Sequence, residues 1–140
     1  MKIFIDANIL FMASVPGSAT IILFDAALKY TDECVTNPHA LEEARRNIAN
    51  KKPSLLPQFR QVSEKLTISN AFYSSLRADL PSQDIPVLAG AIGSRCTHLW
   101  SLDKKYFGKL YGKTIHGVNV VSPIVLADVL GDIGWVAKKL

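Results

Sequence analysis

Short apolar runs that alternate with longer, helix-patterned segments are the feature that most constrains this fold. The runs at residues 2–5, 33–36, 66–69, 99–101 and 118–121 have the length of buried strands. Runs without polar alternation are typical of strands covered on both faces of a parallel sheet. Segments between them place apolar residues at helical spacing, as expected of helices that connect parallel strands. We therefore expect an α/β fold, a three-layer α/β/α sandwich with a central, mostly parallel sheet.

Helix boundaries follow from capping residues and from proline. Helices are expected around residues 9–10 and at 18–30, 38–50, 55–65, 71–79, 82–92 and 122–130. Asn37 followed by Pro38 is a typical helix start, with a capping side chain and then proline at the first helical position. Gly90 and Gly93 are expected to let their helix lie close to the sheet. Apolar residues of the last helix, such as Leu126 and Leu130, belong either to the core or to a dimer surface.

Length and composition favour one globular domain over residues 1–140. Hydrophobic residues make up 49% of the chain and charged residues 20%, and neither repeats nor low-complexity linkers occur. No apolar run reaches the roughly 18 residues needed to cross a bilayer. Asp6 interrupts the apolar N-terminal stretch, which argues against a signal peptide. We expect a cytoplasmic protein in which Cys34 and Cys96 are buried and reduced.

Four of the twelve acidic residues are singled out by position. Asp6 ends the first expected strand, Asp103 follows the strand at 99–101, Asp84 starts an apolar helix, and Glu43 lies in the helix after the second strand. Taken singly, Asp6 and Asp103 are explained equally well as helix caps. Asp84 would complement a helix dipole, and Glu43 would be a surface ion-pair partner.

Taken together, the four acids point to a metal site. Ligands of open α/β sheets bind beyond the carboxyl ends of the strands, where these residues are expected. Two carboxylates about 4 Å apart repel by roughly 4 kcal/mol at an effective dielectric constant near 20, so four in one cleft need a cation. Mg²⁺ and Mn²⁺ prefer oxygen ligands, and no Cys or His spacing suggests zinc. The net charge of +4 is compatible with a polyanionic partner without establishing one.

The four acids belong to an ordered set of five segments. These are residues 4–10 (FIDANIL), 41–48 (LEEARRNI), 84–91 (DIPVLAGA), 99–107 (LWSLDKKYF) and 120–123 (VVSP). In this order they resemble the motifs of PIN-domain nucleases, the family of VapC toxins and PilT N-terminal domains. Ser101 replaces the more usual Thr, and Gly90 stands where Ala is common. Glu42 and Glu43 both remain candidates, and Glu43 is favoured because Ala44 and Ile48 then face the core.

This resemblance implies a divalent-metal-dependent ribonuclease that hydrolyses phosphodiester bonds. It assigns catalysis and Mg²⁺ or Mn²⁺ binding to Asp6, Glu43, Asp84 and Asp103. Asn8 and Ser101 would orient these ligands, with helix capping and strand-end hydrogen bonding as the alternative. Nucleic-acid contacts would come from the basic residues Arg45, Arg46, Lys104 and Lys105.

The resemblance also implies partners. Such nucleases are often the toxin of a type II toxin–antitoxin pair, commonly form homodimers, and are inhibited by a small antitoxin protein. The alternative is a catalytically degraded PIN-like module that binds RNA or a protein partner.

Overall fold

The structure is a computed structural model that describes residues 1–74 and 85–136. Its strands are β1 (Lys2–Ile5), β2 (Glu33–Thr36), β3 (Thr67–Ile68), β4 (His98–Trp100), β5 (Thr114–Ile115) and β6 (Val118–Val121). Its helices are α1 (Ala7–Ala13), α2 (Ala19–Tyr30), α3 (Pro38–Lys51), α4 (Leu56–Glu64), α5 (Ile85–Gly93), α6 (Lys104–Phe107) and α7 (Pro123–Asp132). Single 3-10 turns precede α4 (Pro53–Leu55) and follow α6 (Gly108–Leu110).

The strands form one sheet in the order β3-β2-β1-β4-β6-β5. All neighbouring strands are parallel except β5, which runs antiparallel to β6 at one edge. Strand β5 is not among the strands that the apolar runs predict. It is joined to β6 by His116 and Gly117, which have φ angles of 47° and 84°, as a two-residue hairpin turn requires. Asn-Gly or Asp-Gly is the usual signal for such a turn, and His-Gly is a weak one.

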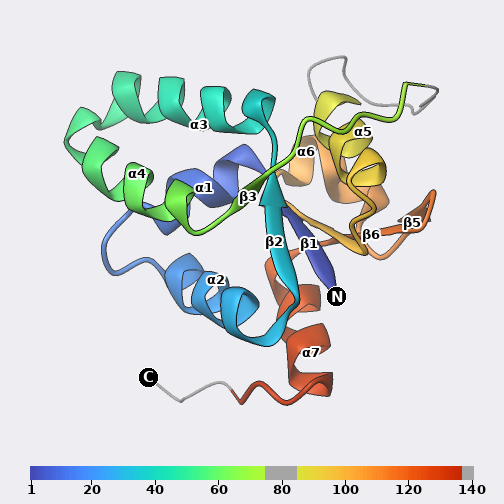
Figure 1. Cartoon of the computed structure of the whole chain (residues 1–140). Helices are drawn as coiled ribbons and strands as arrows, with labels where there is room; N and C mark the ends of the chain where they lie inside the picture. The colour runs from blue at the N-terminus through green and yellow to red at the C-terminus, as the bar shows by residue number, and fades with distance from the viewer. Residues whose placement is uncertain (75–84, 137–140) are drawn as a thin grey trace.

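Helices cover both faces of the sheet, which confirms the predicted α/β/α sandwich. Ile3 and Ile5 of β1 pack in one cluster with buried residues of α1, α2, α3, α4 and α7. Phe4 points to the opposite face, where it packs with residues of α5, with Phe107 and with β6. Figure 1 shows α5 and α6 on the other side of the sheet from α1, α3 and α4.

Capping residues act as their types predict. The Asn37 side chain accepts a hydrogen bond from the Ala40 N–H at the start of α3, and the Ser122 side chain accepts one from the Val125 N–H at the start of α7. Within α7, Leu126 and Leu130 are fully buried and belong to the core, whereas Ile124 is 76% exposed. The dimer alternative is therefore wrong for Leu126 and Leu130.

The helix expected at residues 71–79 is wrong for its described part. Residues 71–73 have no regular secondary structure and run beside α5, where the Tyr73 N–H donates to the carbonyl oxygen of Ala89 at 3.0 Å. Contact with α5 therefore overrides the local helical preference. The expected cap at Ser82 lies outside the described residues.

Both cysteines are buried with free thiols, as expected. None of the helices in the described ranges has the length and apolar character that a membrane span requires.

Candidate active site

The C-terminal ends of β1 and β4 bring together residues that are distant in sequence. Ile5 is paired with Trp100 in the parallel register, so Asp6 and Ser101 leave the sheet side by side. The Ser101 hydroxyl donates to Asp6 Oδ2 at 2.7 Å and accepts from the Asp103 N–H at 3.0 Å. Ser101 is fully buried and Asp6 is only 5% exposed. One buried hydroxyl thus connects two of the predicted acids.

Asn8 strengthens the same connection. Its Oδ1 accepts from the Leu102 N–H at 3.1 Å, and its Nδ2 lies 3.5 Å from the Ser101 hydroxyl, at the limit of a hydrogen bond. Asp6 also caps α1, because its Oδ1 accepts from the Ala7 N–H at 2.7 Å. Asp6 can therefore cap α1 and still belong to the candidate site. The cap holds the carboxylate beside the loop that carries Asp103.

Tyr111 is a site residue that sequence reasoning missed. Its hydroxyl donates to the carbonyl oxygen of Ser101 at 3.0 Å. Burial, followed by the negative charges of Asp103 and Asp6, raises the pKa of Tyr111 to about 12. Both carboxylates are thus close enough to affect the same phenol, which stays protonated at neutral pH. No sequence pattern around Tyr111 identifies it as a site residue. It reaches the site because the chain after α6 folds back over the loop between β4 and α6.

Glu42 and Glu43 occupy different environments on α3. Glu42 is exposed and makes a bidentate ion pair with Arg45, at 2.8 and 2.6 Å. Glu43 is half-buried on the neighbouring part of the helix, and Ala44 and Ile48 are fully buried. The alternative role of Glu43 is that of a surface partner for Arg46 or Asn47, whereas the ion pair that the structure shows on α3 joins Glu42 to Arg45. This geometry leaves Glu43 the better candidate ligand.

The predicted four-acid site is only partly described. Asp84 lies outside the described residues, immediately before α5. Within the described residues, no three His, Cys, Asp or Glu side chains lie together in an arrangement that could hold a metal ion. The described structure joins the Asp6 carboxylate to the backbone of Asp103 through Ser101. Convergence of the Asp103, Glu43 and Asp84 carboxylates on Asp6 stays a prediction.

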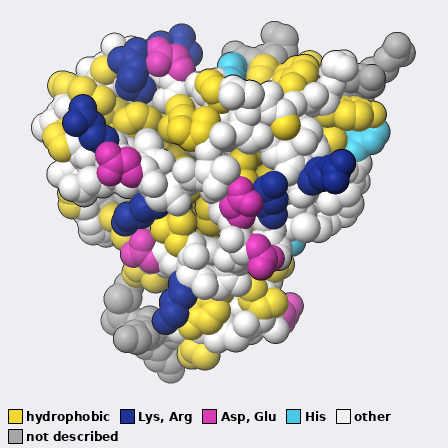
Figure 2. Space-filling view, viewed as in Figure 1, with side chains coloured by type: hydrophobic (Ala, Val, Ile, Leu, Met, Phe, Trp, Pro, Cys, Tyr) yellow, Lys and Arg dark blue, Asp and Glu magenta, His cyan; other side chains and the backbone are white. Residues whose placement is uncertain are grey.

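The predicted nucleic-acid-binding residues are dispersed. Arg45 and Arg46 lie on the exposed side of α3, and Arg45 is occupied by Glu42. Lys104 is exposed at the start of α6, next to Asp103. The side chain of Lys105 lies outside the described part. On the face shown in Figure 2, positive and negative side chains are interspersed with apolar patches.

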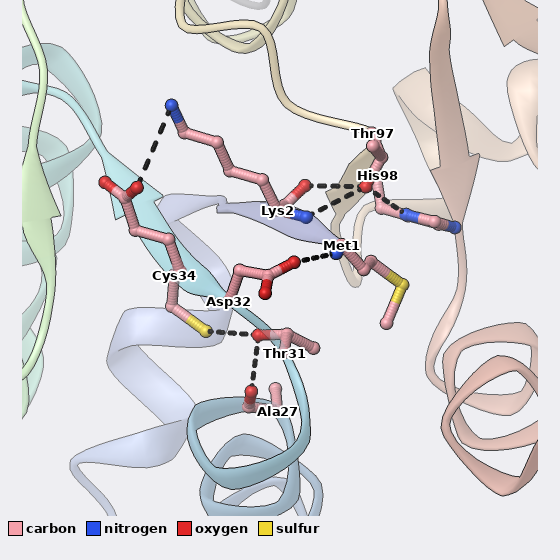
Figure 3. A network of polar contacts seen from close by, with 9 residues as sticks. Met1, Lys2, Ala27, Thr31, Asp32, Cys34, Thr97 and His98 are labelled. Atoms are coloured by element: carbon pink, nitrogen blue, oxygen red, sulfur yellow. Dashed lines mark hydrogen bonds and ion pairs between the residues drawn. The ribbon is translucent and has the colours of Figure 1, made fainter. Parts of the chain in front are cut away.

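The opposite end of the sheet, where β1, β2 and β4 begin, is also polar, but its polar groups link the strands to one another (Figure 3). The Thr97 hydroxyl accepts from the Lys2 N–H at 3.0 Å and donates to the Lys2 carbonyl oxygen at 2.9 Å. The N-terminal amine pairs with Asp32. Burial and then the nearby N-terminal charge lower the pKa of His98. These contacts align β1, β2 and β4, and they gather no cluster of acids.

A cavity of about 550 Å³ lies between α3 and α4, away from the joined acids. It is lined by Pro38, Leu41, Glu42, Arg45, Leu56, Phe59, Arg60 and Ser63. Among its described lining residues, the only acid considered as a ligand is Glu42, the less favoured alternative to Glu43. The carboxyl ends of β1 and β4, where Ser101 links Asp6 to the backbone of Asp103, are therefore the candidate active site.

No protein-family model and no curated protein sequence matches this chain. Solved structures do match it. A chain of the crystal structure of VapBC2 from Rickettsia felis, bound to a DNA fragment from their promoter, is similar with a TM-score of 0.66. The match covers 87% of this chain and 98% of that chain at 16% sequence identity. At this identity the likeness shows a shared fold, and function has to be argued from the site.

Proposed function

We propose that this protein is a divalent-metal-dependent ribonuclease that hydrolyses phosphodiester bonds. The observation that carries the proposal is the buried link from Asp6 through Ser101 to Asp103 at the carboxyl ends of β1 and β4. That edge is where open α/β sheets bind ligands. The fold shared with a chain of the VapBC2 structure supports the same interpretation.

The donor set fits Mg²⁺ or Mn²⁺. Carboxylate oxygens are the ligands that these hard cations prefer. Asp6 and Asp103 would hold the ion together with Glu43 and Asp84. When bound, the metal supplies charge neutralisation at the phosphate and activation of water for hydrolysis.

The residues of the chain have distinct roles in this proposal. Ser101 and the Ala7 N–H hold the two oxygens of the Asp6 carboxylate in fixed directions. Asn8 and Tyr111 fasten the backbone of residues 101–102, which sets the position of Asp103. This pre-arrangement matters because ligands that are already oriented need not reorganise when charge develops on the phosphate.

Cleavage of a labelled single-stranded RNA with Mn²⁺ tests the proposal. We expect Asp6→Asn and Glu43→Gln to lower the cleavage rate at least about 100-fold, as expected when a metal ligand or its support is lost. Two variants serve as matched controls, Asp128→Asn at an exposed position of α7 and Glu42→Gln. Both are expected to cleave at the wild-type rate. Full activity in Asp6→Asn would exclude this site, and equal loss in Glu42→Gln would exclude the choice of Glu43.

Under the same proposal the chain is a cytoplasmic toxin of a type II toxin–antitoxin pair. It would form a homodimer and be inhibited by an antitoxin protein. Support comes from the fold, which is shared with a chain of a structure described as VapBC2 with promoter DNA. Co-expression with the product of a small neighbouring gene tests this part, since an antitoxin is expected to restore growth that the chain alone inhibits.

A second candidate function is a PIN-like module that binds RNA or a protein without cleaving. It is favoured by one observation: within the described ranges no three potential ligands are gathered for a metal. Calorimetric titration with Mn²⁺ separates the two candidates. A nuclease is expected to bind the ion and lose that binding in Asp6→Asn, whereas the degraded module binds no ion in either form.

A further inference from the structure

A hollow smaller than the cavity between α3 and α4 lies at the carboxyl ends of β2 and β3, the same end of the sheet as Asp6. It has a volume of about 280 Å³ and is lined by Asn37, Pro38, His39, Ser69, Asn70, Ala71, Phe72 and Pro86. This is at the lower end of small-molecule pockets, so it suits one flat group better than a whole ligand. Its lining combines two aromatic residues (Phe72 and His39), two prolines and two asparagines. Such a lining can take a planar ring with hydrogen-bonding edges.

Phe72 presents an exposed ring from a firmly held backbone. A Cβ atom added to Gly93 would lie 2.6 Å from the Phe72 nitrogen, so α5 and the backbone of Phe72 are in close contact. On either side, the Tyr73 N–H donates to Ala89, and the Ala71 N–H donates to the Ser69 hydroxyl. Nevertheless the Phe72 side chain is 56% exposed. An exposed aromatic side chain on a fixed backbone can serve as a stacking platform for a base.

Strand register places this hollow next to the acids. Thr36 is paired with Ile68, and its hydroxyl donates to the carbonyl oxygen of Ile5 at 3.0 Å. The residues that follow these three strands are Ser69, Asn37 and Asp6, in spatial order. Adjacent strands are separated by about 4.8 Å, so Asn37 in the hollow lies one strand from Asp6, and Ser69 lies two strands, roughly 10 Å, away. In Figure 1 the segment after β3 passes from this sheet edge across α5.

The Asn37 amide forms the wall between the hollow and the acids. Its Nδ2 donates to the carbonyl oxygen of Pro86 at 3.3 Å, and its Oδ1 caps α3. A Cβ atom at Gly90 would come within 2.4 Å of the same Nδ2, so glycine at 90 leaves room for this amide. Both the Asn37 amide and the backbone of Phe72 are therefore held in place by neighbouring groups.

We propose that this hollow binds one unstacked base of a single-stranded RNA, which stacks on Phe72 while the backbone passes Asp6 and Asp103. The inference rests on the proposed ribonuclease function and adds to it a base subsite beside the scissile bond. Unpaired RNA bases commonly bind by stacking on aromatic side chains with hydrogen bonds to their edges. Stacking is tolerant of base identity, so the subsite would favour single strands over duplexes without fixing a sequence.

The test measures binding of fluorescein-labelled hexaadenylate by anisotropy, in an Asp6→Asn background that prevents cleavage. Phe72→Ala and Phe72→Leu are expected to weaken binding by about 5- to 150-fold, as loss of one stacked base does. Phe72→Trp is expected to retain affinity because it keeps a ring. Ile124→Ala, which removes an exposed apolar side chain on α7, is the matched control and should bind normally. An abasic hexamer should bind all variants equally.

The outcomes separate this inference from the function on which it rests. If the wild type cleaves RNA and Phe72→Ala binds hexaadenylate as tightly as the control, the base subsite is wrong and the nuclease stands. Normal binding by Phe72→Leu would show apolar contact rather than stacking and would also overturn the subsite. Loss of a protein partner in Phe72→Ala, with RNA binding unchanged, would assign the hollow to that partner. If the wild type neither binds nor cleaves RNA, both proposals fail.

Discussion

Ser101 shows how much of the candidate site depends on one side chain. A serine hydroxyl has one donor and two acceptor positions, and Ser101 uses them between Asp6 and the backbone of Asp103. Both hydrogen-bonding partners lie at the end of β1 or just after β4, so the hydroxyl also joins two strands. Asn8 and Tyr111 contact the same short loop from opposite ends of the sequence. Among the described contacts, neutral groups hold the Asp6 carboxylate and the backbone N–H of Asp103.

Removal of this hydroxyl is expected to destabilise the protein. Ser101→Ala would leave a buried carboxylate with one fewer donor, and hydrogen bonds to charged groups contribute about 1.5–3 kcal/mol. Urea unfolding followed by circular dichroism measures this loss. Ser63→Ala is the matched control, because the Ser63 hydroxyl only bonds back to the carbonyl oxygen of Phe59 on α4. Its effect should stay within about 0.5 kcal/mol, and equal losses in the two variants would contradict the role given to Ser101.

At the scale of an element, helix α5 shows how two glycines, which have no side chain, let a helix pack closely against its neighbours. Its Gly90 faces Asn37 and Phe4, and its Gly93 faces the backbone of Phe72. The expectation that the glycines let their helix lie close to the sheet is confirmed for Gly90, which faces Phe4 of β1, whereas Gly93 contacts the segment after β3. Gly93 thus lets residues 71–72 pass directly against α5.

Gly93→Ala is therefore expected to lower the free energy of unfolding by about 1–3 kcal/mol. The added Cβ would overlap backbone atoms of Phe72, which cannot rotate away as a flexible side chain can. Gly131→Ala is the matched control, since α7 has open space at that position. There the change should stabilise the helix by about 0.5–1 kcal/mol. Chemical denaturation of both variants checks the pair, and stabilisation by Gly93→Ala would show that α5 and Phe72 are not in close contact.

At the scale of the whole molecule, burial of two thiols and one phenol makes the free energy of unfolding depend on pH in the alkaline range. Burial is the main cause that raises the pKa of Cys34 to about 11 and of Cys96 to about 12, from 9.0. Burial also raises that of Tyr111 to about 12, from 10.0. The unfolded chain then loses these protons at lower pH than the folded protein does. Their contribution to stability is complete below pH 9 and is lost as the pH rises through the folded pKa values.

Stability should therefore fall between about pH 9 and pH 12. In this window each raised group contributes a slope of up to about 1.4 kcal/mol per pH unit. Denaturant unfolding at a series of pH values measures the slope, and the double variant Cys34→Ala, Cys96→Ala should have a shallower one. A slope unchanged by the double substitution would mean that the two thiols do not titrate differently in the folded and unfolded chains.

Local sequence determined the strands other than β5, the helix caps at Asn37 and Ser122, and the α/β class, because apolar spacing and capping act over three or four residues. It also placed Asp6 and Asp103 after strands, so that in a parallel sheet the link from Asp6 to the backbone of Asp103 lies where ligands are expected.

Tertiary structure alone decided the rest. The link between Asp6 and Ser101 spans 95 positions and depends on strand order, and Tyr111 reaches the site only because the chain after α6 folds back. The extended path of residues 71–73 and the burial of Leu126 depend on which surfaces pack together. Such contacts leave no periodic trace in the sequence, since they are set by neighbours that are close only after folding.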